Sequence, residues 1–236
     1  MGDKKVTAVV LAAGKGNRMN SSVAKQFLML GGKPVVYYSL KAFEDSSVDE
    51  IILVTGRDQR DYCRDNIVKP YHISKVTQII EGGKERYDSV YQALISIRQT
   101  DYVLIHDGAR PFITKEQIEK IIDEVMKYKA CILGTPVKET IKVVDSNGFI
   151  TATPARSKLW AAQTPQAFAY EAIKKAYTIF HQEQDSTEAA VTDDAMVYET
   201  YLGNTVKIIA GNYSNIKITT PEDLMAAEVL LNTITF

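Results

Sequence analysis

Cysteine is scarce in this chain of 236 residues, which has only Cys63 and Cys131. The two lie far apart and show no metal-type spacing, which argues against a disulfide framework and against a zinc site of the usual pattern. Two cysteines without a pattern are typical of a reduced compartment. The sequence also contains nothing that resembles a signal peptide and no apolar run of membrane-spanning length. We therefore expect a cytoplasmic protein without a membrane partner.

An excess of charge of one sign is also missing. Lys and Arg together number 28 and Asp and Glu 29, which gives a formal net charge of −1. Without a global basic field we expect no nucleic-acid partner, and any phosphate ligand must be held by local charge. The hydrophobic content of 45% and the length suit one globular α/β domain, so we expect a single domain over residues 1–236.

Small residues and cations follow the first apolar segment. Residues 6–11 are rich in β-branched side chains and predict a buried strand. The turn after this strand leaves backbone N–H groups uncovered at Ala12, Ala13, Gly14 and Gly16. Three cations follow within eleven residues, namely Lys15, Arg18 and Lys25. Bare amides beside clustered positive charge predict an anion site, and a polyphosphate fits it best.

Two familiar phosphate-binding motifs do not match this turn. A Walker A loop requires G-x-x-x-x-G-K-[ST], a spacing that this turn lacks. A dinucleotide fingerprint requires G-x-G-x-x-G, but the third glycine position holds Met19, whose side chain would hinder close packing of helix on strand. An NAD-binding module is therefore disfavoured. The other alternative is a tight strand-to-helix turn with incidental surface lysines, which Arg18 and Lys25 make the weaker interpretation.

Apolar segments typical of buried strands alternate with segments typical of helices along the rest of the chain. Strands are predicted at residues 51–55, 76–80, 102–106, 131–137 and 205–211. Helices are predicted to begin near residues 34, 57, 115, 170, 192 and 221, and a further helix is predicted to carry Val90, Leu94 and Ile97 on one face. This alternation predicts an α/β fold with a Rossmann-like, mostly parallel sheet flanked by helices. Ligands of such sheets bind at the carboxyl ends of the strands.

Polar residues and glycines follow two of these strands. Asp107 ends one of them, and its hard carboxylate oxygens suit Mg²⁺ beside a polyphosphate. His106 is predicted to be structural, because it has no Cys or His companion for a soft metal. Gly82 and Gly83 could form a plain turn, and Arg110 could belong to a surface turn.

The α/β alternation breaks at residues 138–157, where we expect a protruding β-hairpin arm. Two β-type segments flank the pair Asn147-Gly148, which is typical of hairpin turns. An isolated hairpin is marginal in water, so the apolar side chains of this segment need cover. A second protomer could supply that cover, or the hairpin could fold back on its own sheet. The residues alone leave both possibilities open.

Several residues of the last third have two interpretations. Lys217 lies between apolar residues of a predicted strand, where a cation is costly unless it is paired with an anion; a phosphate explains it better than a solvent-facing position. Thr164 and Gln166 could be turn residues or polar contacts to a ligand. Thr192 would ordinarily cap the helix that follows it. The single tryptophan, Trp160, is by default a core or interface anchor.

Five motifs, in this order, resemble the sugar-phosphate nucleotidyltransferases. The first matches the family's L-A-A-G-x-G-x-R-M followed by P-K-Q, with Ala24 in place of the proline. The others are G-G-x-x-R-x-x-S-V from residue 82, H-D-G-A-R-P from residue 106, L-W-A-A-Q-T-P-Q-A-F from residue 159 and N-I-K-I-T-T-P-E-D-L from residue 215. The resemblance covers essentially the whole chain and is most specific to the methylerythritol-phosphate cytidylyltransferases.

This resemblance implies a nucleotidyltransferase fold and a reaction. The reaction would transfer CMP from CTP to methylerythritol phosphate and release pyrophosphate, in non-mevalonate isoprenoid biosynthesis. CTP and methylerythritol phosphate would then be the partners, and Mg²⁺ or another divalent cation the cofactor. The resemblance also implies a homodimer whose hairpin arms are exchanged, each carrying Thr140 and Arg156 into the neighbour's site. A ribitol-5-phosphate cytidylyltransferase and a nucleotide-sensing module without turnover are the alternatives.

The anion site and the resemblance together assign roles to individual residues. Catalytic roles are expected for Lys15, Arg18, Lys25 and Lys217. Contacts to the nucleotide are expected from Ala12, Ala13, Gly14, Gly16, Gly82, Gly83 and Ser89. Contacts to the acceptor are expected from Asp107, Arg110, Thr140, Arg156, Thr164 and Thr192, with Asp107 also holding the metal. Because a phosphate monoester is largely dianionic at neutral pH, it needs no general base for in-line attack on the α-phosphate.

Overall fold

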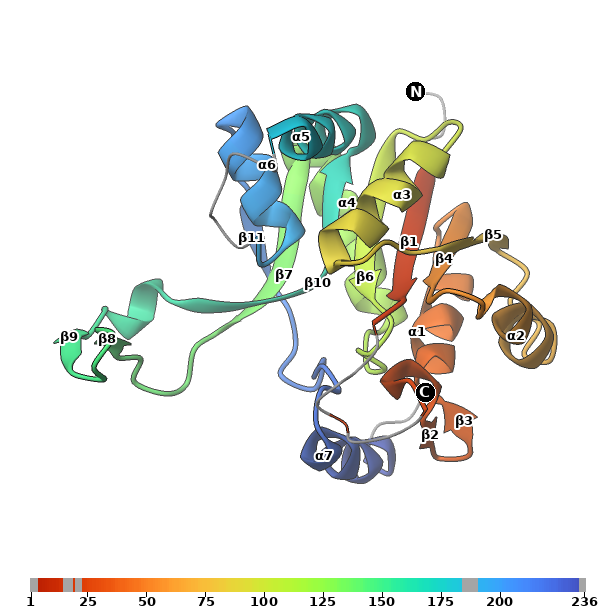
Figure 1. Cartoon of the computed structure of the whole chain (residues 1–236), viewed down its shortest axis with the longest axis horizontal. Coiled ribbons are helices and arrows are strands. Elements are labelled where there is room, and N and C mark those ends of the chain that lie inside the picture. The colour runs from red at the N-terminus through yellow and green to blue at the C-terminus, as the bar shows by residue number, and fades with distance from the viewer. Residues whose placement is uncertain (1–3, 15–18, 20–22, 184–190, 234–236) are drawn as a thin grey trace.

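The computed structural model describes residues 4–14, 19, 23–183 and 191–233. Its centre is a seven-stranded sheet with the strand order β11-β7-β10-β6-β1-β4-β5 (Figure 1). The strands are β1 (Val6–Ala12), β4 (Glu50–Thr55), β5 (Val76–Glu81), β6 (Tyr102–Asp107), β7 (Ala130–Pro136), β10 (Trp160–Ala169) and β11 (Lys207–Ala210). Neighbours in this sheet pair in parallel except at β10, which is antiparallel to β6 and β7. The predicted α/β fold with a mostly parallel sheet is confirmed.

The antiparallel strand β10 is not among the predicted strands. Gln166 lies opposite Ile105 of β6 and Ile132 of β7, so β10 is inserted between these two strands. Its sequence is rich in alanine and polar residues and has neither the alternation nor the apolar run that predicts a strand. The insertion buries Thr164 and Gln166, which are 4% and 1% exposed, within the sheet.

Helices cover both faces of the sheet (Figure 1). One face carries α1 (Val35–Glu44), α2 (Arg60–Cys63) with its π-helical continuation Arg64–Val68, and α4 (Lys115–Tyr128). The other face carries α3 (Arg86–Ser96), α5 (Tyr170–Glu183) and α6 (Asp194–Leu202). The alternation of side chains along β1 explains the two layers, since Ala8 and Val10 pack in the first core and Val9 packs in the second.

A smaller hydrophobic cluster lies beyond the carboxyl ends of the strands. There α7 (Pro221–Leu231) packs near the short hairpin of β2 (Met29–Leu30) and β3 (Lys33–Pro34). α7 begins as predicted, with Pro221 in its first turn and a capping box between Thr220 and Asp223. The same holds for α4, whose capping box joins Thr114 and Gln117.

Three helix starts differ from the prediction. α2 begins at Arg60 rather than at residue 57, because Asp58 takes the left-handed conformation with φ 63°. Pro34 is the N-cap of α1 rather than its first residue. The cap of α6 is Asp193 and not Thr192, because the Asp193 carboxylate accepts the backbone N–H three residues further on.

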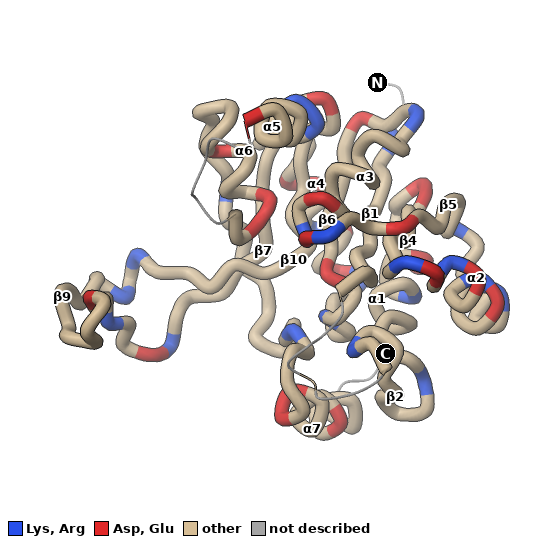
Figure 2. The backbone as a smooth tube through the Cα atoms, viewed as in Figure 1, with Lys and Arg blue, Asp and Glu red and all other residues tan. Residues whose placement is uncertain are grey.

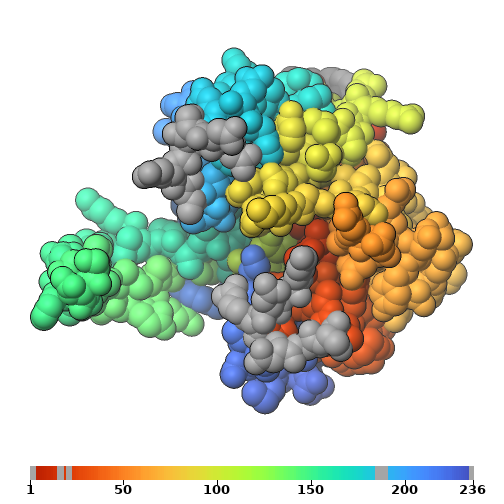
Figure 3. Space-filling view, viewed as in Figure 1, coloured from red at the N-terminus to blue at the C-terminus, as the bar shows by residue number. Residues whose placement is uncertain are grey.

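The arm, residues 138–157, projects from the body (Figures 1 and 3). Near its tip, β8 (Val143–Val144) and β9 (Ile150–Ala152) pair as a separate two-stranded sheet. The alternative in which the hairpin folds back on its own sheet is therefore wrong.

Local hydrogen bonds shape the turn of the arm. The Asp145 carboxylate accepts the backbone N–H groups of Asn147 and Phe149. Gly148 takes φ +85°, a conformation that glycine adopts without strain, whereas Asn147 does not take a positive φ. The predicted hairpin turn is thus present, with Gly148 rather than the pair Asn147-Gly148 in the left-handed region.

Candidate active site

A pocket opens where β6 and β10 meet the segment before α7. It is lined by Arg86, Asp107, Arg110, Ala162, Gln163, Thr164, Gln166, Thr192, Asp193 and Lys217. The structure thus brings together five of the predicted site residues, namely Asp107, Arg110, Thr164, Thr192 and Lys217. Asp107 ends β6, so the pocket lies at the carboxyl end of a parallel strand, as predicted.

Asp107 is the centre of a cluster of cations. Its Oδ2 lies 2.7 Å from Lys217 Nζ and 3.9 Å from Arg110 Nε, and its Oδ1 accepts a hydrogen bond from Arg86 Nε at 3.1 Å. Burial alone would raise the pKa of this carboxyl group. The three cations outweigh burial and hold the pKa of Asp107 well below its usual range, so the group is ionised at neutral pH.

Lys217 is not in a strand, as had been predicted, but in an extended segment between β11 and α7. The segment is fastened to the turn after β6 by a hydrogen bond from Ile218 N to Ala109 O at 2.8 Å. Asn215 strengthens this attachment, because its carbonyl accepts Arg110 Nη1 at 2.7 Å and its Nδ2 donates to Thr164 O at 2.9 Å. The anion paired with this lysine in the structure is the Asp107 carboxylate, and the predicted phosphate partner stays a prediction.

Arg110 has spare hydrogen-bonding capacity in the pocket. Its side chain is only 12% exposed, and burial lowers the pKa of its guanidinium. Among the described residues, its Nε is one of three buried side-chain N or O atoms without a hydrogen-bond partner. A buried donor left unpaired is costly, and an anion bound in the pocket would satisfy it.

Arg86 is a pocket residue that the sequence analysis did not select. It is the first residue of α3 and pairs with Asp107 and, through both terminal nitrogens, with the fully buried Asp194. The arginine stands in the motif G-G-x-x-R-x-x-S-V, which was the available signal. Asp194 gave no comparable signal, because its partner lies 108 residues away in the sequence.

His106 is structural, as predicted, and it is completely buried. Its Nε2 lies 3.3 Å from Arg110 O and its Nδ1 lies 3.1 Å from Thr164 Oγ1. Because the carbonyl can only accept, these partners assign the Nε2–H tautomer. Burial lowers the pKa of His106 to about 4, which keeps the ring neutral at pH 7. Thr164 Oγ1 also accepts the backbone N–H of Asp107 at 3.0 Å, so Thr164 and His106 together support the end of β6.

One side of the pocket includes the start of α6. Gln166 Oε1 accepts the N–H of Ala195, and Gln166 Nε2 donates to the Asp193 carboxylate. These bonds attach α6 to β10 and place Thr192, which is exposed, at the edge of the pocket.

Residues predicted to hold the nucleotide base lie together outside this pocket. A Cβ built on Gly82 would lie 2.7 Å from the Cβ of Ala13 and 2.5 Å from Ser89 Oγ, so only glycine fits there. Ser89 Oγ accepts Gly83 N at 3.1 Å and donates to Glu85 O at 3.0 Å. Ala12 ends β1, and Gly14, which follows Ala13, is exposed. The turn after β1 and the loop after β5 therefore meet at the carboxyl ends of the strands.

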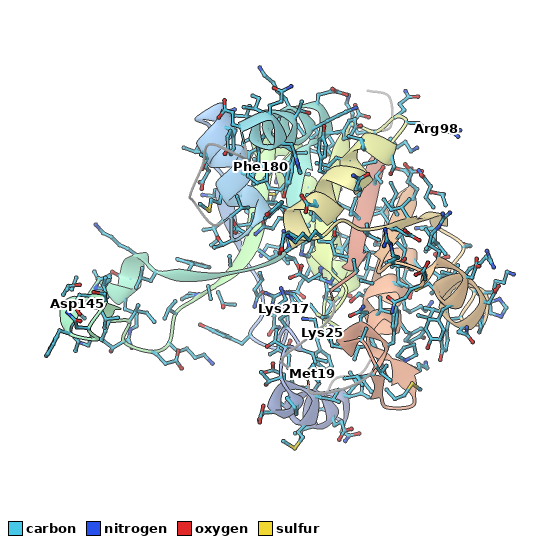
Figure 4. All side chains as sticks on the ribbon, viewed as in Figure 1. Met19, Lys25, Arg98, Asp145, Phe180 and Lys217 are labelled. Carbon is cyan, nitrogen blue, oxygen red and sulfur yellow. The ribbon has the colours of Figure 1, made fainter. Side chains whose placement is uncertain are left out.

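Lys25 begins a short 3₁₀ turn, Lys25–Phe27, and is half-buried. The turn is attached to the end of β1 by Gln26, whose Nε2 donates to Ala12 O. Figure 4 labels Lys25 and Lys217 between the lower end of the sheet and α7. Three further predicted residues, Lys15, Gly16 and Arg18, lie outside the described residues.

The arm residues Thr140 and Arg156 do not line the pocket of their own chain. Both are exposed, and Arg156 Nη1 donates to Lys138 O at 2.8 Å across the base of the arm. Trp160, at the start of β10, is 38% exposed and is therefore not a core residue.

The charge distribution and the available metal-binding side chains limit which ligands the site can bind. Acidic and basic residues are interspersed along the elements that Figure 2 colours. No group of three or more His, Cys, Asp or Glu residues that could hold a metal occurs within residues 4–14, 19, 23–183 and 191–233. In that same part of the chain, every helix is too short or too polar to cross a membrane.

Comparison with known proteins identifies relatives of this chain. The family described as IspD, 2-C-methyl-D-erythritol 4-phosphate cytidylyltransferase, matches residues 6–233. A 2-C-methyl-D-erythritol 4-phosphate cytidylyltransferase of Lachnoclostridium phytofermentans is 50% identical over 228 residues, which cover 97% of each chain. The enzyme of the same name from Alkaliphilus oremlandii is 48% identical over 231 residues, covering 97% of this chain and 96% of that protein.

Solved structures agree with the sequence relatives. The 4-diphosphocytidyl-2C-methyl-D-erythritol synthase of Anaerococcus prevotii superposes with a TM-score of 0.83 at 34% identity, covering 97% of this chain and 96% of that one. The 2-C-methyl-D-erythritol 4-phosphate cytidylyltransferase of Thermus thermophilus gives a TM-score of 0.76 at 25% identity, covering 95% and 98%. The fold is thus the one expected from the motifs.

Proposed function

The chain belongs to the 2-C-methyl-D-erythritol 4-phosphate cytidylyltransferase family, and from this premise we propose that it transfers CMP from CTP to 2-C-methyl-D-erythritol 4-phosphate. The products are 4-diphosphocytidyl-2-C-methyl-D-erythritol and pyrophosphate, in non-mevalonate isoprenoid biosynthesis. The observation that carries the proposal is the cation cluster around Asp107, at the carboxyl end of β6. This cluster includes Arg110, whose buried Nε has no hydrogen-bond partner among the described residues.

The chemistry requires positioning and charge neutralisation. The acceptor phosphate is largely dianionic near pH 7 and attacks the α-phosphate in line, so no side chain has to remove a proton. Negative charge grows on the α-phosphate and on the departing pyrophosphate. Fixed cations and amides stabilise this charge better than water does, because they need no reorganisation during the reaction.

The individual residues divide this task. Lys25 and the amides of Ala12, Ala13 and Gly14 would hold the triphosphate, together with Lys15, Gly16 and Arg18. Gly82, Gly83 and Ser89 would receive the base at the edge formed by the two loops. Lys217 would stabilise the α-phosphate, and Arg110, Thr164 and Thr192 would bind the acceptor. The proximity of Gly82, Ala13 and Ser89 and the pocket around Lys217 support this division.

A divalent cation, Mg²⁺, fits the donor set of the site. Mg²⁺ is usually held by one or two carboxylates together with substrate phosphates and water, and Asp107 offers a hard carboxylate that stays ionised. When bound, the cation would neutralise charge on the triphosphate. Removing divalent cations with EDTA should abolish pyrophosphate release, and added Mg²⁺ should restore it.

We further propose that residues 1–236 act as one catalytic domain and that two copies form a homodimer through the arm. Thr140 and Arg156 would then reach the acceptor in the neighbouring subunit. The support is their exposed position on the arm together with the exposed apolar side chains of the same segment. A cytoplasmic location is proposed because Cys63 and Cys131 are free and buried, as in proteins of reduced compartments.

The experiment supplies purified protein with CTP and Mg²⁺ and follows pyrophosphate release. One tube receives methylerythritol phosphate and the other ribitol 5-phosphate. We expect release only with the former, because the matching family and the relatives named above all act, by name, on methylerythritol phosphate. Release only with ribitol 5-phosphate would overturn the acceptor. Binding of CTP without release in either tube would indicate a nucleotide sensor instead.

A further inference from the structure

One arginine in the pocket is already neutralised within the protein. Arg86 Nη1 donates to Asp194 Oδ1 at 2.9 Å, and its Nη2 donates to Asp194 Oδ2 at 2.8 Å. This bidentate pair has no net charge to offer a phosphate. Lys217 and Arg110 differ, because these two cations share the single carboxylate of Asp107 and Arg110 Nε has no hydrogen-bond partner among the described residues. Arg86 therefore has a different task from the other cations of the pocket.

The remaining guanidinium nitrogen of Arg86 faces Asp107. Its Nε donates to Oδ1 at 3.1 Å, whereas Oδ2 of the same carboxylate lies 2.7 Å from Lys217 Nζ. One oxygen is thus bound by the clamped arginine and the other holds the lysine. Because a carboxylate cannot rotate without breaking the bond at its first oxygen, Arg86 sets the direction in which the second oxygen meets Lys217.

Asp194 is itself fixed from behind. It is completely buried as the first residue of α6, and Tyr177 of α5 donates to its Oδ1 at 2.6 Å. Gln166 of β10 holds the start of the same helix by a bond to the N–H of Ala195. Tyr177 of α5 therefore holds the Asp194 carboxylate, β10 holds the start of its helix, and Arg86 transmits that position to Asp107.

We propose that Arg86 and Asp194 are positioning residues for the transfer reaction, which orient Asp107 and through it keep Lys217 Nζ where the reacting phosphate binds. This inference rests on the proposed function. The pair contributes direction rather than charge, and neither residue is assigned a contact to a reacting atom. A misplacement of about 1 Å at a catalytic group can cost on the order of 100-fold in rate, so such a pair has a measurable effect.

If the Arg86–Asp194 ion pair only stabilised the packing of α3 against α6, a different result would follow. Loss of such a stabilising pair would lower the melting temperature and leave turnover unchanged at temperatures where the protein is folded. A positioning pair lowers kcat in the fully folded protein, and lowers it more than it raises the KM for CTP, because the lost contact matters most in the transition state.

The test uses the double substitution Arg86→Gln with Asp194→Asn, which removes both charges and leaves no buried charge unpaired. Arg86→Lys is the second variant, since it keeps the charge but loses the planar fork. The matched control is Arg64→Gln with Asp65→Asn, an exposed arginine–aspartate pair of similar two-point geometry outside the pocket. Pyrophosphate release is measured below the melting temperature, and circular dichroism verifies the fold.

We expect kcat to fall on the order of 10- to 100-fold in both Arg86 variants and to stay unchanged in the control. In an Asp107→Asn background, the double substitution should add little, because the pair acts through Asp107. Wild-type kcat in the folded double variant, with only a lower melting temperature, would overturn this inference alone. If the wild-type chain released no pyrophosphate in the same assay, the proposed function would fail and this inference with it.

Discussion

The carboxyl end of the sheet and the hairpin arm differ in the burial and pairing of their side chains. At the sheet end, the charged groups of Asp107 and Asp194 are buried, and each is paired with a cation of the same chain. In the arm, large apolar side chains remain in solvent, and Phe149 and Ile150 are 72% and 62% exposed. The sheet end thus pairs its buried carboxylates within one chain, whereas the arm leaves apolar surface uncovered.

This difference indicates what each region requires. Buried charges persist only where they are paired, so the network around Asp107 must be built by the fold itself. A two-stranded hairpin with exposed apolar residues is marginal alone, so the arm requires a surface on another molecule. The proposed second copy of this chain would supply that surface and would receive Thr140 and Arg156 in its site.

The sharpest test of the comparison applies one kind of change to both regions. Leu104→Ala in the middle of β6 removes a completely buried side chain, and we expect a loss of about 2–5 kcal/mol in the free energy of unfolding. Ile150→Ala in the arm should change it by less than about 0.5 kcal/mol under conditions where the chain is monomeric. Urea denaturation of both variants measures this, and equal losses would contradict the contrast drawn between body and arm.

The two lysines of the proposed site test the sheet end directly. Lys217→Ala and Lys25→Ala should each lose about 3–4 kcal/mol of transition-state stabilisation with little change in fold, because each removes a fixed cation from developing charge. Steady-state pyrophosphate release gives the loss in kcat/KM. Lys127→Ala, at an exposed ion pair with Glu124, is the control. Near-normal turnover in either site variant, with thermal unfolding intact, would refute the assigned roles.

Mixing two inactive variants tests whether the arm serves a neighbour. Arg156→Ala should weaken use of the acceptor by about 1.5–3 kcal/mol, the usual value of a hydrogen bond to a charged group. In a mixed dimer with Lys217→Ala, one site would receive both an intact lysine and an intact arm. We therefore expect activity above the mean of the two separate variants after subunit exchange. Activity that stays at that mean would show that each arm serves its own chain or no site.

A substitution at the apolar tip of the arm should have a smaller effect, which is confined to dimer formation. Phe149→Asp places a charge on the most exposed large apolar side chain of the described chain and should shift the dimer towards monomer. Sedimentation velocity measures the shift. The unfolding free energy of the monomer should change by no more than about 0.5 kcal/mol. An unchanged sedimentation coefficient would argue against the arm as the dimer contact.

The two cysteines should show no effect at all while the chain is folded. Cys63 and Cys131 are completely buried, and burial raises the pKa of each thiol to about 12. A thiol reagent at pH 8 should therefore label neither residue until denaturant unfolds the protein. Ser146→Cys in the exposed turn of the arm should be labelled at once, which provides the positive control.

Local chemistry of the sequence determined most of the elements. The strand that ends at Ala12 and the starts of α4 and α7 depend on neighbours within a few residues, so they could be read directly. The turn around Gly148 was predicted for the same reason. Asp107, Arg110, Thr164, Thr192 and Lys217 line one pocket. Motif resemblance had placed them in one family site, and the roles assigned to them stay predictions.

Only the tertiary structure decided which segments pair with one another. β10 is antiparallel because the chain returns between β6 and β7, and its alanine-rich sequence has no local signal for that pairing. Lys217 lies in an extended segment that bonds to the turn after β6, not in a strand. The direction of the arm was likewise open, since its apolar residues suit any covering surface.

The ion-pair network around Arg86 is the clearest case. Asp107 and Asp194 are 21 and 108 residues away from it in the sequence, so no periodicity or capping rule connects the three. The energy that unites them comes from burial, which makes an unpaired charge costly and a paired one tolerable. That energy exists only once the helices have packed on the sheet, and for this reason the sequence determined the parts of the site and the fold determined their partners.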